Sequence, residues 1–324
     1  MTLHPGRLLA AALLLAATAW PLGAGAETLR FATLKTGTVN WELDTIKHYE
    51  LDKKAGFEME ILEMAGNPAT RIAFQGGEAD SMVADWLWVA RQRAEGKDYV
   101  FIPYSTAVGG LLVAPDSPVQ KLSDLKGGKI GIAGGPLDKS WLILLAYAKK
   151  TEGLDLAAET EQVFGAPPLI FQNALQREID ATINFWHFLA KMKAKGFREV
   201  VSVTEASTAL GLDPETPLLG YVVSGDLVNN KPELAKGLAE ASRAAKTLLA
   251  TDDAAWERLR PMMNVADAAE FEALKAGYRA GIPGEDSVDV EAARSMYALM
   301  AELGGEELVG AAKTLPDGVF YQGE

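Results

Sequence analysis

Short apolar segments alternate with helical segments along the first two hundred residues, and this alternation begins twice. The first series runs from the apolar segment at 29–34 to the one at 109–115. After Pro115 comes a turn-rich connection, and a second series of apolar and helical segments follows. Because this alternation is typical of parallel sheets covered by helices, the sequence predicts a two-lobed α/β protein with mixed, mainly parallel sheets.

One short stretch occurs in both series. The segment EADSMVADWLW begins at Glu78, and a counterpart, EIDATINFWHF, begins at Glu178. Each reads as an acidic turn, a short strand, and an aromatic residue where the strand meets the next helix. Ligands of open parallel sheets collect beyond the carboxyl ends of the strands, so Trp86 and Trp186 are predicted to face each other across a shared crevice. The alternative is that each tryptophan packs helix against sheet within its own lobe.

The character of the chain changes after Lys231, where long alanine-rich amphipathic segments begin. We expect these helices to pack on lobe one, because the strand-like segment LLGYVVS just before them can return the chain to the first sheet. The predicted organisation is a signal segment at 1–26, lobe one at 27–112 and 220–324, and lobe two at 113–219. Lys246 is expected on an exposed helix face.

The first 26 residues have the three zones of a secretory signal. Arg7 precedes a continuous apolar run, which ends at the small residues Ala24, Gly25 and Ala26. This run is shorter than the roughly 20 residues that a membrane anchor needs, so we expect cleavage before Glu27 and release into the periplasm.

The chain has no cysteine, which excludes disulfides and a lipid-modified cysteine. Its formal net charge of −13 disfavours binding to nucleic acid.

Four segments carry a resemblance to a known family. They are LRFATLKTGTVNWEL at 29–43, AFQGGEADSMVADW at 73–86, GGLLVAPDSPVQKLSDLKGGKIGIAGGPLDKSW at 109–141 and ALQREIDATINFW at 174–186. With them the chain resembles the periplasmic solute-binding proteins of ABC importers, in the nitrate/sulfonate/taurine and thiamine-precursor (NMT1/THI5-like) group. The resemblance implies two α/β lobes joined by two crossing segments, a solute held between them, and closure by a hinge. It also implies a monomer that delivers its solute to a membrane permease and ATPase complex.

The segment AGGPLDKSW is the strongest candidate for contact with the solute. A strand ends at Gly134 and Gly135, which permit close backbone approach, and free N–H groups at the start of the next helix suit an anion. Asp138 complicates this prediction, because it can cap the helix internally. The candidate residues from this segment are Gly135, Asp138, Lys139, Ser140 and Trp141.

The remaining candidates lie at other strand ends. The family resemblance places the loop with Lys35, Thr38 and Trp41 at the cleft, although Trp41 can equally be a packing residue. Asn67 begins another helix, where it is either a ligand contact or an N-terminal cap. Asp85 stands beside Trp86, and Asn184 stands at the equivalent strand end of lobe two. The full candidate set is Lys35, Thr38, Trp41, Asn67, Asp85, Trp86, Gly135, Asp138, Lys139, Ser140, Trp141, Asn184 and Trp186.

The tryptophans favour an organic solute over a small inorganic ion, because flat rings gain from stacking. We therefore expect an anionic or heteroaromatic compound such as a sulfonate, carboxylate or pyrimidine, with nitrate-like ions as the second choice. We expect no cofactor or metal, since His48 and His187 are isolated and no cysteine is present. The chain lacks nucleophile-elbow and phosphate-loop motifs, so an enzyme is the minor alternative. A ligand-sensing receptor is the third.

Overall fold

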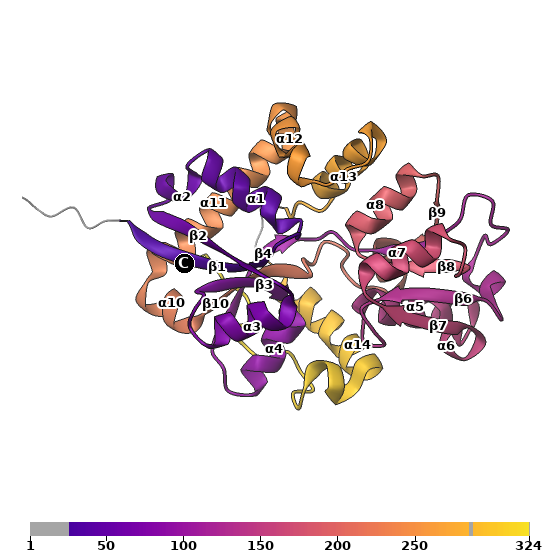
Figure 1. Ribbon diagram of the computed structural model, residues 1–324. Helices are drawn as coiled ribbons and strands as arrows, with labels where there is room; N and C mark the ends of the chain where they lie inside the picture. The colour runs from indigo at the N-terminus through magenta and orange to yellow at the C-terminus, as the bar shows by residue number, and fades with distance from the viewer. Residues whose placement is uncertain (1–25, 285–287, 324) are drawn as a thin grey trace, which may run out of the picture.

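The computed structural model describes residues 26–284 and 288–323, so the predicted signal segment at 1–25 lies outside the described residues. The chain forms two five-stranded sheets, each with helices packed around it. Figure 1 shows the two lobes side by side, with lobe one at the left and lobe two at the right. Among the described residues, no helix is both long and apolar enough to span a membrane.

The sheet of lobe one has the strand order β2-β1-β3-β10-β4. Strands β1, β2 and β3 are parallel, and β10 runs antiparallel to its neighbours β3 and β4. The strands are β1 (Glu27–Leu34), β2 (Phe57–Met64), β3 (Ser81–Asp85), β4 (Tyr99–Ser105) and β10 (Leu219–Ser224). The helices of this lobe, apart from the tail, are α1 (Val39–His48), α2 (Leu51–Lys54), α3 (Asn67–Gln75), α4 (Trp86–Ala94) and α10 (Gly225–Asn230).

The sheet of lobe two has the strand order β7-β6-β8-β5-β9. Strand β6 is parallel to β7 and β8, whereas β5 is antiparallel to β8 and β9. The strands are β5 (Gly110–Val113), β6 (Lys129–Ala133), β7 (Glu161–Gly165), β8 (Ala181–Ile183) and β9 (Arg198–Ser202). The helices are η1 (Leu122–Leu125), α5 (Lys139–Glu152), α6 (Leu156–Glu159), α7 (Pro167–Leu175), α8 (Trp186–Ala194) and α9 (Val203–Leu210). The predicted mixed α/β architecture is confirmed.

Local sequence explains where these elements begin and end. In β2, Phe57 and Met59 are buried while Glu58 and Glu60 are exposed, which is the alternation of a strand with one covered face. Helix α5 begins after Asp138, whose carboxylate accepts a hydrogen bond from the Trp141 N–H. It ends at Gly153, whose positive φ of 63° is the left-handed conformation favoured after a helix.

Two short segments connect the lobes, at 106–109 and 211–218. The boundary between the lobes lies earlier than the predicted residue 113, because β5 already pairs in the second sheet from Gly110 onward. The apolar segment at 109–115 showed that a strand forms there without showing which sheet it joins. On the return, β10 enters the first sheet as predicted.

The C-terminal tail is helical and packs on lobe one, as predicted, with α11 against α1 and α2, and α14 against α4. It also reaches lobe two, where α13 packs on α8 and α14 packs on α5. The amphipathic pattern predicted these helices without identifying the second set of partners. The tail elements are α11 (Pro232–Thr251), α12 (Asp253–Leu259), η2 (Arg260–Met262), α13 (Ala268–Ala280) and α14 (Val290–Val309).

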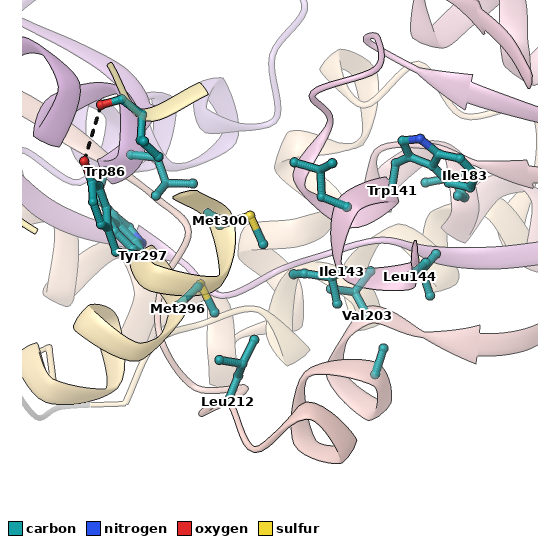
Figure 2. Close-up of a cluster of buried hydrophobic side chains, with 14 of the residues drawn as sticks. Trp86, Trp141, Ile143, Leu144, Ile183, Val203, Leu212, Met296, Tyr297 and Met300 are labelled. Atoms are coloured by element: carbon teal, nitrogen blue, oxygen red, sulfur yellow. Dashed lines mark hydrogen bonds between the residues drawn. The ribbon is translucent and has the colours of Figure 1, made fainter. Parts of the chain in front are cut away.

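One cluster of buried apolar side chains continues from lobe one into lobe two. It includes Trp86 of lobe one, Met296 and Met300 of α14, and Ile143 and Val203 of lobe two. Figure 2 shows Met296 and Met300 between these two groups. The interface between the lobes is therefore partly an apolar core, to which the tail contributes side chains.

The expectation that Lys246 is exposed is wrong. Its Nζ lies 2.8 Å from Oε2 of Glu42, which is itself fully buried. The same carboxylate accepts hydrogen bonds from the hydroxyl groups of Tyr221, Ser242 and Tyr278. A buried charge is costly unless it is paired and hydrogen-bonded, and this cluster satisfies both conditions. Lys246 lies one turn after Ser242, on the buried face of α11 rather than its solvent face.

Candidate functional site

The carboxyl edges of the two sheets face each other. Asp85 ends β3, Lys139 begins the helix that follows β6, and the Lys139 Nζ lies 3.0 Å from the Asp85 Oδ2. Trp41 lies in the helix after β1 and Trp186 begins the helix after β8, with 6.1 Å between their ring centroids. The lobes therefore meet at the edges where α/β sheets collect ligands.

Asp85 joins the lobes with one carboxylate oxygen and caps its own helix with the other. Its Oδ1 accepts the Trp88 N–H of α4 at 2.9 Å, while its Oδ2 accepts from Lys139. Burial opposes ionisation of Asp85, but the Lys139 ammonium, the Trp88 N–H and the Arg71 charge outweigh it, so the pKa of Asp85 lies below its usual value. The sequence predicted both Asp85 and Lys139 as site residues but not their pairing.

Asp138 caps α5 rather than standing free for a ligand. Its Oδ1 accepts the Trp141 N–H at 3.1 Å. Burial raises the pKa of Asp138, and the nearby Asp85 charge adds to this effect. Gly135 has open space where a side chain would begin, and Ser140 lies beside the first crossing, 3.6 Å from the position a Cβ would take at Gly109.

The prediction that Trp86 faces the crevice is wrong. Its side chain is fully buried in lobe one, stacked on Tyr297 at 6.4 Å between ring centroids and packed against Phe320 at 5.7 Å. Figure 2 shows Trp86 and Tyr297 together in this core. Trp141 is also a packing residue, 3% exposed within the core of lobe two. Trp86 is buried because Tyr297 and Phe320 from the C-terminal part of the chain cover it.

The pair of tryptophans that meets across the lobes is Trp41 and Trp186. Trp41 is 5% exposed and also packs edge-on against Trp256 at 5.9 Å. Tyr278 of α13 completes this aromatic group, with its ring centroid 6.1 Å from that of Trp41. Trp186 is half-buried. Trp256 and Tyr278 were missed by sequence reasoning, because they come from the tail.

The polar candidates have different surroundings. Asn184 is buried and structural: its Nδ2 donates to the Pro167 carbonyl at 2.9 Å, and its Oδ1 accepts the Phe185 N–H at 2.8 Å. Asn67 is exposed as the first residue of α3, and its side chain does not cap that helix. Lys35 is exposed and Thr38 is half-buried in the turn between β1 and α1.

Two residues outside the predicted set lie close to these strand ends. The Arg71 guanidinium lies over the Trp88 ring at 5.3 Å, near enough to Asp85 for its charge to lower that pKa. Phe185 precedes α8 and is 43% exposed, an unusual exposure for a large apolar side chain. Its position between Asn184 and Trp186 in the repeated stretch was the signal that could have identified it.

Burial and then the Lys191 charge lower the pKa of His187 from 6.5 to about 4, so the ring is neutral near pH 7. Residues 26–284 and 288–323 contain no group of three or more His, Asp or Glu side chains that could hold a metal ion.

Comparisons with solved structures show which proteins share this fold. The aliphatic sulphonate binding protein SsuA of Escherichia coli is 19% identical, with a TM-score of 0.72 over 91% of this chain and 92% of that one. The alkanesulfonate-binding protein SsuA of Xanthomonas axonopodis pv. citri, bound to MOPS, is 18% identical, with a TM-score of 0.69 over 92% and 99%. A DszB mutant in complex with biphenyl-2-sulfinic acid is 16% identical, with a TM-score of 0.58 over 90% and 97%.

The chain has the two-lobed fold of these SsuA proteins. No curated protein sequence matches it. The family model described as NMT1/THI5 like matches residues 53–255, which is more than half of the chain. The protein therefore belongs to the NMT1/THI5-like family.

Proposed function

We propose that this protein is the periplasmic solute-binding component of an ABC importer. It captures a small organic solute between its lobes, closes around the solute, and delivers it to a membrane permease. The observation that carries this proposal is the Asp85–Lys139 pair, which joins the carboxyl edges of the two sheets. The fold shared with SsuA and the family membership support it.

The groups near the facing edges favour a solute with an anionic or heteroaromatic part. Lys35, Arg71 and Lys139 supply positive charge, and Phe185 and Trp186 supply flat apolar surface. A sulfonate, carboxylate or pyrimidine with an organic body uses both kinds of group. The rings add about 0.5–1.5 kcal/mol when they stack on an aromatic solute. A nitrate-sized ion would leave the apolar surface unused.

Closure follows from how the lobes are connected. The crossings at 106–109 and 211–218 are the only connections along the described chain between the two sheets, so rotation about them moves one lobe against the other. A solute shifts the equilibrium toward the closed state only to the extent that its affinity for the closed state exceeds its affinity for the open state. No step of this cycle requires covalent chemistry.

A thermal-shift screen of residues 27–324 against sulfonates, carboxylates, pyrimidines and nitrate tests the proposal. A true solute at a hundred times its dissociation constant should stabilise the folded chain by about 2.7 kcal/mol. Trp186→Ala should weaken this effect, whereas Lys149→Ala, at an exposed position of α5, should not. Recovery of the unchanged solute in a one-to-one complex distinguishes capture from catalysis. Conversion of the solute to a product would contradict the proposal.

A further inference from the structure

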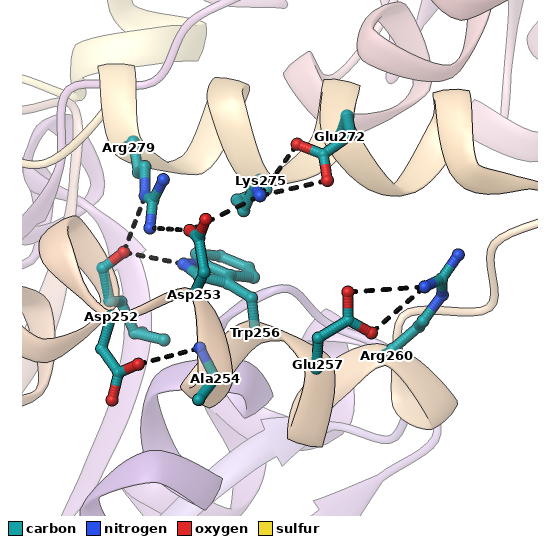
Figure 3. Close-up of polar contacts among 10 residues, drawn as sticks. Asp252, Asp253, Ala254, Trp256, Glu257, Arg260, Glu272, Lys275 and Arg279 are labelled. Atoms are coloured by element: carbon teal, nitrogen blue, oxygen red, sulfur yellow. Dashed lines mark hydrogen bonds and ion pairs between the residues drawn. The ribbon is translucent and has the colours of Figure 1, made fainter.

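Helix α13 of the tail is fixed to lobe one. The Tyr278 hydroxyl donates to the buried Glu42 Oε2 at 2.8 Å. Arg279 bonds the Leu249 carbonyl at 2.9 Å and the Asp253 carboxylate at 2.7 Å. Figure 3 shows Arg279 and Lys275 of α13 directed at Asp253 of the adjoining helix. These contacts make α13 part of lobe one in any rotation about the crossings.

The same helix ends at the hinge. The Gly281 carbonyl accepts the Thr106 N–H at 2.9 Å and the Ser105 hydroxyl at 3.2 Å. Thr106 belongs to the first crossing, so the C-terminal end of α13 lies at the pivot between the lobes. Its other residues extend from the pivot along α8 of lobe two.

Polar contacts bind α8 to α13 across the lobes. The Glu270 side chain is only 5% exposed, and its Oε1 lies 2.8 Å from the Lys195 Nζ at the end of α8. The Lys191 Nζ lies 3.8 Å from the Glu270 Oε2 and donates to the Asn264 carbonyl at 2.7 Å. One nearly buried carboxylate of lobe one is thus paired with two ammonium groups of lobe two.

Close packing accompanies these charges. Gly277 faces the Trp186 ring so closely that a Cβ at residue 277 would lie 2.9 Å from an indole carbon. Ala190 of α8 belongs to the apolar core of lobe one, together with Phe271 and Leu274 of α13. The apolar part of the contact is therefore closely packed.

We propose that α13 is an interlobe clasp and that Glu270 is the positioning residue that holds the solute-free protein largely closed. Opening about the crossings separates α8 from α13 and removes Lys195 and Lys191 from the Glu270 carboxylate, which is 5% exposed while the lobes are in contact. Separation forfeits the attraction between these opposite charges, which is stronger in the sheltered contact than in water. The clasp contains no predicted solute contact other than the edge of Trp186.

The clasp has a consequence for affinity that rests on the proposed function. Apparent affinity is the intrinsic affinity multiplied by the fraction of protein in the binding-competent state. A clasp that favours the closed form also slows solute entry, since the solute enters only when the lobes part. Weakening the clasp should therefore speed association, even if the closed complex itself becomes less stable.

Distance measurement between the lobes tests the clasp without any solute. The chain has no cysteine, so Lys54→Cys on α2 and Lys150→Cys on α5 provide two unique sites for spin labels at exposed positions. Glu270→Gln removes the charge. The side-chain amide oxygen of the glutamine can still accept the hydrogen bond from the Ala266 N–H, just before α13. Lys195→Gln removes the partner from lobe two. Glu272→Gln is the matched control, because Glu272 pairs with Lys275 inside α13.

We expect a single short distance in the parent protein and the Glu272→Gln control. In Glu270→Gln and Lys195→Gln the ratio of closed to open molecules should fall roughly tenfold, and the double variant should fall little further, as for a coupled pair. A parent that is mainly open, unchanged distances in both variants, or an equal shift in the control would overturn the clasp. Failure to find a solute would overturn the proposed function. The distances would still test the clasp, because they are measured without a solute.

Discussion

Asp85 shows how much a single carboxylate contributes at the residue scale. One oxygen caps α4 and the other reaches Lys139 in the opposite lobe. Aspartate is a preferred residue at the start of a helix, and here the capping geometry also directs a charge toward the second lobe. Capping fixes the carboxylate in place, so less conformational freedom is lost when Lys139 binds to it.

Two substitutions of Asp85 separate its two roles. Asp85→Asn keeps a good N-terminal cap but removes the charge, whereas Asp85→Ala removes both. The alanine variant should be about 1 kcal/mol less stable than the asparagine variant, which is the typical value of a helix cap. Urea unfolding of both variants gives this difference. Equal stabilities would show that the cap contributes nothing.

His187 gives a prediction about pH. Its pKa is about 4 in the folded chain, against 6.5 for an unperturbed histidine. Between these values the unfolded chain binds more protons, so the His187 contribution to stability is lost as the pH falls through this window. His187→Asn should therefore lose less stability than the parent when the pH is lowered from about 7 to about 5. Parallel loss in urea titrations of the two proteins would contradict this prediction.

At the scale of elements, the sequence predicted strands and helices better than it predicted their neighbours. The repeated stretch correctly marked β3 with α4 and β8 with α8. It also suggested equal roles for Trp86 and Trp186, and the structure gives them different ones. Trp86 is covered by Tyr297 and Phe320, which follow it by more than two hundred residues, whereas Trp186 meets α13 at the interlobe contact. Local periodicity carries no information about such distant partners.

The candidate site was predictable to a similar degree. Strand ends and helix starts identified Asp85 and Lys139, because these positions follow from the alternating pattern. The internal role of Asp138 was foreseen only as an alternative. Pairing across the lobes depends on how the two sheets are placed, and that placement depends on the tail helices.

Gly277 provides a prediction at the scale of the α8–α13 contact. In an ordinary helix, glycine to alanine is stabilising by about 0.8–1 kcal/mol. Here Gly277→Ala should destabilise the protein, because its Cβ would overlap the Trp186 ring. In a Trp186→Ala background the same change should become stabilising. Urea unfolding of the four proteins measures this change of sign, and the same sign in both backgrounds would be inconsistent with the contact.

At the scale of the whole molecule, the two lobes share one core. The cluster containing Trp86, Met296 and Ile143 passes from lobe one through α14 to lobe two. Neither lobe can lose its packing without exposing apolar surface on the other. The lobes are therefore coupled in folding although each has a separate sheet.

This coupling predicts one unfolding transition for the whole chain. Calorimetry should give a calorimetric enthalpy equal to the van't Hoff enthalpy, as for a two-state process. Met300→Ala, which removes a side chain at the junction of the lobes, should lower the stability by about 2–5 kcal/mol. Two separate heat-absorption peaks in the parent protein would show that the lobes unfold independently.

The position of β10 affects the order in which a growing chain can assemble. It lies between β3 and β4, so the first sheet stays divided until Ser224 has been synthesised. The second sheet has all five of its strands once Ser202 has been made. As the chain emerges from its N-terminus, the lobe nearer the middle of the chain can thus complete its sheet before the lobe that contains the N-terminus.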